Sequence, residues 1–260
     1  MMCRLALRFG VVAYIAAILL VPVGLIFWRT FEHGIGPAWA AVTTPDARHA
    51  FWLTLEIAAI AVPLNTIFGI VCALAIVRHD FPGKGILNAI VDLPLALSPV
   101  VIGLALFLLY GRTGWLNNLP FQVLFSMPAM VLATMFVSLP FVVREVVPVL
   151  REVGTDQEQA AATLGAGPIS TFRRVTLPSI RWAVAYGVVL TTARSIGEFG
   201  AVSVVSGRIA GRTETLTLLV QDRYENFDLT GAYAASVVLA MIAIATLVLL
   251  TIFKPREERT

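Results

Sequence analysis

Long uncharged runs limit what this chain can fold into. Helices need roughly 20 apolar residues to cross the hydrocarbon of a bilayer, and helices satisfy their own backbone groups there. We therefore expect an all-α, polytopic membrane protein with about six transmembrane helices. The runs cover residues 9–28, 57–77, 93–111, 116–143 and 232–253, the fourth being long enough to include a loop; a sixth, 182–207, is broken only by Arg194 and Glu198.

The composition agrees with a single membrane domain. Charged residues make up 13% of the chain and hydrophobic residues 58%, whereas a soluble domain carries about 25% charged residues. We expect one transmembrane domain over residues 1–260, with a core at 50–253. The two cysteines and three histidines show no disulfide or metal-ligand spacing. We therefore expect no metal, no cofactor bound by this chain and no nucleic-acid partner, but contact with membrane lipid.

Basic residues predict the orientation, because cytoplasmic segments carry an excess of Lys and Arg. With the N-terminus inside, the inner segments carry twelve of the 19 basic residues and the outer loops six. This places both termini and residues 151–180 in the cytoplasm. The first apolar run has twenty uncharged residues and no cleavage site after it, so we interpret it as an uncleaved span instead of a signal peptide.

Residues 151–180 form a polar connection much longer than the usual two to eight residues between packed helices. Thr155 and Glu158 have the spacing of a capping box, in which each side chain binds a backbone N–H of the first turn. Gly165 stands where a left-handed C-terminal cap is expected, and Pro168 prevents simple continuation. The sequence predicts a short helix displayed at the membrane surface.

This segment resembles the EAA loop of ATP-binding-cassette (ABC) importer permeases. The family pattern is Glu-Ala-Ala, three residues, Gly, nine residues and Ile-x-Leu-Pro. Gln159 stands at the Glu position, with Glu158 one residue earlier. The resemblance implies that the loop fits a cleft on an ATPase subunit and transmits its closure; the alternative is a merely solvated amphipathic loop. The other positions that follow the pattern are Ala160, Ala161, Gly165, Val175, Leu177 and Pro178.

Arg194 and Glu198 stand inside an apolar run, where each charge costs about 2.5–3.5 kcal/mol. Arg194 lies roughly 20 Å along the helix from Ile180, and an i, i+4 spacing allows the two side chains to pair. In one interpretation they only stabilise the bundle. In the other they line a translocation path, with Arg194 offering a positive site to an oxyanion. The further path candidates are Thr191, Ser195, Ser98 and Ser138.

Residues 194–207 look very like the W-type subunit of the sulfate/thiosulfate permease family, as do residues 92–100 and 133–145. Molybdate permeases share a string similar to the Gly-Glu-Phe-Gly core at 197–200. The resemblance implies a type I ABC importer permease of the bacterial cell membrane. It also implies a homologous T-type permease subunit, two copies of a cytoplasmic ATPase and an extracytoplasmic sulfate-binding protein as partners.

Three functional hypotheses remain open on the sequence. The leading one is a permease subunit of an ATP-driven sulfate/thiosulfate importer, with ATP used by the partner ATPase, since this chain lacks a phosphate-binding Gly-x-x-x-x-Gly-Lys-Ser/Thr loop. A molybdate or tungstate importer permease is the alternative within the class. A stand-alone carrier or intramembrane enzyme is a third, but the sequence shows no nucleophile–base set or metal ligands for catalysis.

Overall fold

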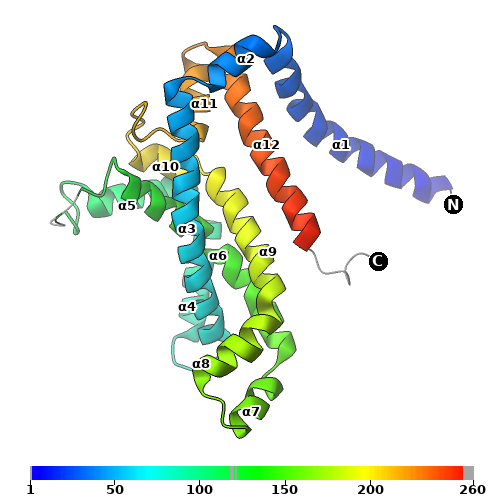
Figure 1. Cartoon of the computed structure of the whole chain (residues 1–260), viewed down its shortest axis with the longest axis vertical. Helices are drawn as coiled ribbons and strands as arrows, with labels where there is room; N and C mark the ends of the chain where they lie inside the picture. The colour runs from blue at the N-terminus through cyan, green and yellow to red at the C-terminus, as the bar shows by residue number, and fades with distance from the viewer. Residues whose placement is uncertain (1, 118–119, 121, 254–260) are drawn as a thin grey trace.

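The computed structural model describes residues 2–117, 120 and 122–253, and all regular structure in this part of the chain is helical. The longest helices run along one axis of the molecule (Figure 1). In chain order the helices are α1 (Met2–Phe31), α2 (Ile35–Val42), α3 (Pro45–Arg78), α4 (Lys84–Ala96), α5 (Pro99–Tyr110), α6 (Met127–Val153), α7 (Asp156–Thr163), α8 (Pro168–Thr171), the π-helix η1 (Phe172–Thr176), α9 (Leu177–Ile196), α10 (Gly200–Val205), α11 (Leu216–Glu225) and α12 (Leu229–Phe253).

Helices α3, α6 and α9 form the centre of the bundle, each packed against the other two. Glycines allow the close approach: a Cβ atom built on Gly69 of α3 would lie 2.8 Å from the Cβ atom of Val142, and one on Gly187 of α9 would lie 3.0 Å from its Cα atom. Small residues let helix backbones approach in this way in membranes. Helix α1 contacts α2 and α12 and leans away from the body of the molecule (Figure 1).

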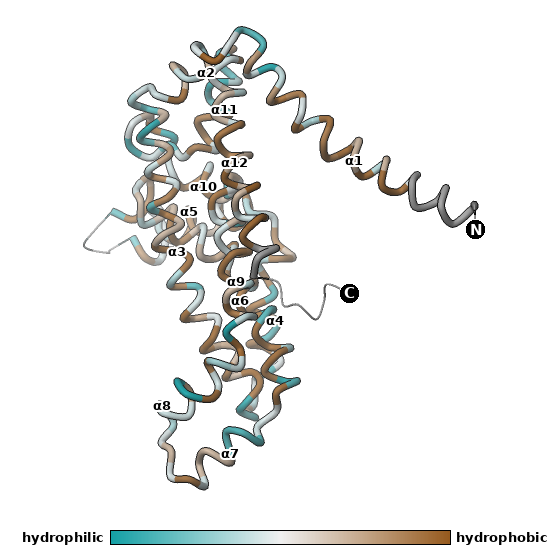
Figure 2. Tube along the Cα trace, turned by 45° about the vertical axis from the view of Figure 1, so that its right-hand side comes forward, coloured by the Kyte–Doolittle hydropathy of each residue, from teal (hydrophilic) through white to brown (hydrophobic). Residues whose placement is uncertain are grey.

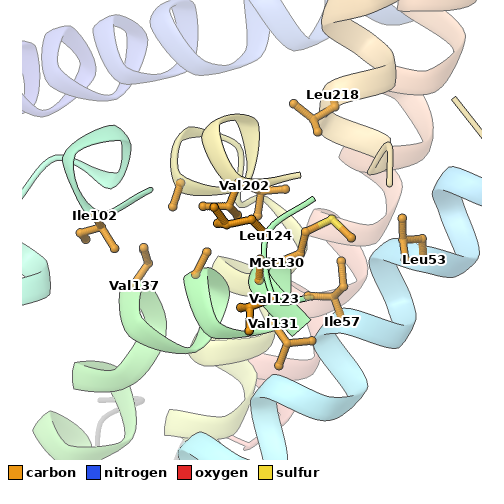
Figure 3. Packing of buried hydrophobic residues seen from close by; sticks show 14 residues of the cluster. Leu53, Ile57, Ile102, Val123, Leu124, Met130, Val131, Val137, Val202 and Leu218 are labelled. Atoms are coloured by element: carbon orange, nitrogen blue, oxygen red, sulfur yellow. The ribbon is translucent and has the colours of Figure 1, made fainter. Parts of the chain in front are cut away.

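Apolar side chains fill the bundle in separate clusters. The largest joins α3, α5, α6, α10 and α11 (Figure 3), where Leu53 and Ile57 of α3 lie near Met130 of α6 and Val202 of α10. A second cluster, around Ile76, joins the other ends of α3, α6 and α9. Since lipid is as apolar as leucine, these clusters stabilise the bundle through packing instead of removal from water.

Four described helices are long and apolar enough to cross a membrane: Gly10–Phe31, Pro45–Arg78, Met127–Val153 and Leu229–Thr246. A fifth span results if α4 and α5, which are bent by 112° at their junction, count as one. The expected count of about six includes α9, which has 20 residues but carries Arg181 and Arg194. A less apolar helix is tolerated there because α9 packs against α3, α6 and α12.

Two of the apolar runs are broken and do not form one straight helix each. Run 93–111 turns at Leu97 and Ser98, both extended, before Pro99 begins α5. A proline disfavours the helical conformation in the residue before it, which explains the turn. Run 182–207 divides at Gly197 into α9 and the short α10. The apolar runs predicted segments of membrane length, and the structure adds that these two segments are broken.

The polar segment 151–180 forms one end of the long axis, opposite α2 and α11 (Figure 1). Hydrophilic residues gather at the α7 end of the molecule and also around α2 and α11 at the opposite end, and apolar residues predominate along the long helices between them (Figure 2). This distribution separates two water-exposed ends from a membrane-embedded body.

Candidate functional site

The short helix α7 is present at the predicted place and ends as predicted. Gly165 has a positive φ of 81°, which costs a glycine little because it has no Cβ. The Gly165 N–H donates to the Ala162 carbonyl at 3.0 Å, and the Ala166 N–H donates to the Ala161 carbonyl at 3.0 Å. This pair of bonds is the Schellman motif.

The predicted capping box at the start of α7 was wrong. Thr155 makes no side-chain cap bond; its Oγ1 atom instead accepts a hydrogen bond from Gln159 Nε2 at 3.0 Å. Glu158 does not reach back to the helix start, because its carboxylate binds groups from other helices. The Glu158 carboxylate pairs with Arg78 instead of binding a backbone N–H at the start of α7.

Glu158 is the centre of a contact that we call the clasp, formed by Arg78, Glu158 and Thr176. Arg78 Nε lies 2.9 Å from Glu158 Oε2, and Arg78 Nη2 donates to Glu158 Oε1 at 3.2 Å. Thr176 Oγ1 donates to the same Oε1 atom at 2.8 Å. Arg78 also donates to the carbonyls of Leu150 and Gly154, at 3.0 and 2.7 Å. The clasp therefore joins α7 to the ends of α3 and α6 and to η1.

Sequence reasoning missed the clasp. It treated Arg78 as one of the basic residues that set orientation, and Arg78 and Glu158 are 80 positions apart. The available signal was the placement of Arg78 at the end of a span, where a basic side chain can bind the free carbonyls of helix ends. The position of Arg78 in the sequence does not indicate that Glu158 is its partner.

The outer face of α7 borders an open groove of about 640 Å³. Leu164, which lines this groove, exposes 88% of its surface, and Ile169 of α8 exposes 83%. Large exposed apolar side chains of this kind favour contact with a protein partner. The structure brings four of the predicted coupling residues, Ala160, Ala161, Val175 and Pro178, to this groove. The lining is completed by Gln157, Leu164, Arg174, Ser179 and Arg181.

The other predicted coupling residues lie away from the groove. Leu177 packs against the apolar cluster of α3, α6 and α9, Gly165 closes α7, and Gln159 is exposed. Glu158 has both carboxylate oxygens engaged within this chain. It is therefore not displayed as a substitute for the carboxylate that Gln159 replaces.

Arg194 and Glu198 form the second predicted site. Arg194 Nη1 lies 2.7 Å from Glu198 Oε2; the Glu198 side chain is 1% exposed and that of Arg194 is 30% exposed. Glu198 lies past the end of α9, and its Oε1 atom accepts a hydrogen bond from the Ala201 N–H at 2.8 Å. The carboxylate therefore serves two partners, since it also caps the first turn of α10.

Polar side chains connect this pair to the centre of the bundle. Ser195 is buried and its Oγ atom lies 3.5 Å from Ser138 Oγ on α6. Asn65 of α3, which sequence reasoning missed, is fully buried and donates to Ser138 Oγ at 2.8 Å. Thr191 is buried and donates to its own helix at Gly187. Ser98 lies instead at the exposed junction of α4 and α5.

Two cavities of different size lie where α9 ends. A void of about 10 Å³ adjoins Glu198, which is about the size of one water molecule. A second cavity of about 350 Å³ lies between α9, α11 and α12 beside Gly197. Within the pair, Arg194 is the partly exposed member and Glu198 is the buried one. The small void is lined by Thr54, Ile57, Thr134, Ser195, Ile196, Glu198, Val202 and Thr215.

The opposite end of the molecule carries its own charged group. Arg223 of α11 donates to the Ala41 carbonyl at 3.0 Å and to Thr44 Oγ1 at 2.9 Å, which fixes α11 against the junction of α2 and α3. Burial raises the pKa of the nearby Glu214 to about 6, with Asp222 adding to the effect. Sequence reasoning predicted no role for these residues.

Comparison with known proteins identifies the family. The model of the family described as "binding-protein-dependent transport system inner membrane component" matches residues 65–259. This chain belongs to that family. The predicted family is thereby confirmed, and the chain is a transport subunit instead of an enzyme.

Relatives within the family are similar over almost the whole chain. A sulfate transport system permease protein CysW from Synechococcus elongatus is 48% identical over 250 residues, covering 95% of this chain and 87% of the relative. CysW from Escherichia coli is 49% identical over 247 residues, covering 94% and 85%. CysT from Synechococcus elongatus is 37% identical over 238 residues, covering 90% and 86%.

Solved structures show the same fold at low identity. A chain of a bacterial alginate ABC transporter, in complex with its alginate-bound periplasmic protein, superposes with a TM-score of 0.76 at 16% identity, covering 96% of this chain and 92% of that one. A chain of the MetNI methionine ABC transporter gives a TM-score of 0.55 over 79% of this chain and 95% of that one, at 15% identity. The fold is that of a type I ABC importer permease, as predicted.

Proposed function

We propose that this chain is a transmembrane permease subunit of an ATP-driven importer of sulfate and thiosulfate. The observation that carries the proposal is the 48–49% identity to CysW sulfate permeases over about 95% of the chain. The capped surface helix supports the same proposal, because a carrier working alone has no need of a docking helix at its polar end.

The proposed complex contains a homologous T-type permease subunit, two copies of a cytoplasmic ATPase and an extracytoplasmic sulfate-binding protein. In this arrangement the chain lies in the bacterial cell membrane with both termini and the α7 end in the cytoplasm. The end that carries α2 and α11 then meets the binding protein. The excess of basic residues in the segments on the α7 side supports this orientation.

The electrical work of import explains the need for ATP. Each elementary charge that crosses 100 mV involves about 2.3 kcal/mol. Moving a doubly negative anion into a negative interior therefore costs roughly 5 kcal/mol before any concentration gradient. The ATPase supplies this energy through the groove beside α7, where Ala160, Ala161 and Leu164 offer small and apolar contacts. Gln159, exposed on the same helix, offers an amide in place of the family carboxylate.

Arg194 is the proposed anion contact within the path. Its guanidinium is always charged and presents several N–H donors, and part of it is exposed. Glu198 is buried behind it and balances its charge when no anion is present. Ser195, Ser138 and Thr191 place further hydroxyl groups around α9.

The test uses the complete complex in proteoliposomes, loaded with ATP and supplied with the binding protein. Sulfate or thiosulfate is expected to stimulate ATP hydrolysis and to enter the vesicles, and a non-hydrolysable ATP analogue is expected to abolish uptake. Stimulation by molybdate alone would assign the chain to a molybdate importer. Uptake by this chain without the ATPase would contradict the proposal altogether.

A further inference from the structure

Helix α7 is attached to the bundle by few apolar contacts. None of the eight residues of α7 is buried, so apolar packing contributes little to its position. The chain between α6 and α7 passes through Gly154, which has a positive φ of 65°, and such a glycine leaves the link permissive. The backbone connection through Gly154 alone therefore does not transmit a movement of α7 to the bundle in a defined direction.

The clasp of Arg78, Glu158 and Thr176 supplies a defined connection. The side chains of Arg78 and Glu158 are 11% and 21% exposed, so water screens this pair less than an ion pair at the open surface. Arg78 contacts both oxygens of the carboxylate, through a hydrogen bond from Nη2 to Oε1 and an ion-pair contact between Nε and Oε2, and a charge-assisted hydrogen bond is stronger than a neutral one. One carboxylate on α7 therefore holds the end of α3 through Arg78, and the turn before α9 through Thr176.

Arg78 extends the connection to α6. Its Nη1 and Nη2 atoms donate to Leu150 and Gly154, carbonyls in the last turn and cap of α6, where helix ends leave carbonyls without intrahelical partners. Positive charge is also favourable at the C-termini of α3 and α6. Glu158 of α7 thus binds Thr176, just before α9, and Arg78 of α3, which in turn binds the end of α6.

We propose that the clasp is the positioning element that transmits movement of α7 to α3, α6 and α9, so that Glu158 faces the bundle while the groove side of α7 faces the ATPase. This inference rests on the proposed function, in which α7 contacts the ATPase. It assigns Glu158 to coupling within this subunit and not to contact with the partner. It also makes Arg78 and Thr176 part of the coupling machinery.

The decisive variants are Glu158→Gln and Thr176→Val in the full complex. Glu158→Gln keeps the shape but removes the charge, and places an amide N–H₂ opposite the Arg78 donors. Thr176→Val keeps the volume and removes one hydrogen bond. The matched control is Glu152→Gln, the same change at an exposed carboxylate of α6. Anion uptake and ATP hydrolysis are measured together in proteoliposomes, and the amount of ATPase retained on purification is measured by quantitative electrophoresis.

Glu158→Gln is expected to retain the ATPase and to lower the anion transported per ATP hydrolysed by about tenfold, as hydrogen bonds to charged groups are the stronger ones. Thr176→Val should lower it about threefold, and the double variant should be no worse than Glu158→Gln, because both belong to one network. The control should match the unsubstituted complex. A merely destabilised complex would lose uptake and hydrolysis in proportion, which leaves the ratio unchanged.

Two results would overturn the inference while leaving the proposed function intact. One is a Glu158→Gln complex with the ratio of the unsubstituted protein. The other is loss of bound ATPase from that variant, which would make Glu158 a docking residue. If the unsubstituted complex itself failed to couple hydrolysis to uptake, both the proposed function and the inference would fall.

Discussion

At the scale of single residues, two carboxylates of this protein each bind more than one partner. Glu158 serves Arg78 and Thr176 at the polar end, and Glu198 serves Arg194 and the Ala201 N–H inside the bundle. A buried charge is tolerated when it is paired and hydrogen-bonded. Removal of one partner therefore leaves an uncompensated group, which is a larger penalty than loss of the contact alone.

The pair in the bundle gives a prediction at this scale. Arg194→Met leaves Glu198 buried without its counter-ion, and breaking such a pair can cost about 3–5 kcal/mol. We expect a lower yield of assembled complex from Arg194→Met than from the double variant Arg194→Met/Glu198→Gln, in which the amide oxygen can still accept from the Ala201 N–H. The yield is measured by size-exclusion chromatography of the detergent-purified complex.

Anion uptake by the same variants separates the two roles of Arg194. The double variant should assemble but transport sulfate poorly if Arg194 meets the anion. The change Arg29→Met, at an exposed arginine near the end of α1 that pairs with Glu32, serves as the control. Full uptake by a well-assembled double variant would leave the pair purely structural.

At the scale of elements, contacts at the ends of helices hold α7 in place. Helix α7 is only eight residues long, and isolated helices of that length are marginal in water. Its Schellman cap and the clasp therefore contribute much of what holds it in place. The cap depends on Gly165 adopting a conformation that other residues rarely adopt.

Two neighbouring glycines give a matched prediction at this scale. Gly165→Ala places a Cβ in the left-handed region and should cost roughly 1 kcal/mol, loosening α7 and lowering uptake per ATP hydrolysed. Gly167→Ala should leave coupling unchanged, because Gly167 has a φ of −73°, which alanine adopts readily. Both positions have open space for a methyl group, so the two variants differ only in backbone conformation. Hydrogen exchange of the α7 amides measures the loosening. Equal behaviour of the two variants would rule out a coupling role for the cap.

At the scale of the whole molecule, the central helices depend on close backbone contact. Helix α6 packs against both α3 and α9, and Gly69 of α3 and Gly187 of α9 both approach Val142. Protein interiors at this density transmit strain instead of absorbing it. Under the proposed coupling role of α7, a movement that reaches the ends of these helices is carried along the bundle towards Arg194.

Packing at Gly187 gives the prediction for this scale. Gly187→Ala brings a Cβ to 3.0 Å from the Val142 Cα atom, and overpacking of this kind costs typically about 1–3 kcal/mol. We expect a lower thermal midpoint for the purified protein. Gly24→Ala in α1, where a Cβ meets nothing within 4 Å, should be neutral or slightly stabilising, since alanine favours a helix over glycine. An unchanged midpoint in Gly187→Ala would contradict tight packing at α6 and α9.

The sequence by itself determined the features that depend on local chemistry. Uncharged runs of membrane length predicted the helical membrane fold, Gly165 predicted the end of α7, and the i, i+4 spacing of Arg194 and Glu198 predicted that they can pair. Each of these depends on residues within a few turns of one another. The local pattern also misled in one case, since Thr155 and Glu158 have the spacing of a capping box that does not form.

Only the tertiary structure decided which distant groups meet. Arg78 and Glu158 are brought together by the packing of α3 against α6, and Asn65 reaches Ser138 for the same reason. The bend at Ser98 and the division at Gly197 likewise lie where other helices pack: a Cβ on Gly200 would lie 2.9 Å from the Pro99 Cβ atom. A carboxylate binds the strongest donor that the fold places beside it, and the fold, not the local sequence, supplies that donor.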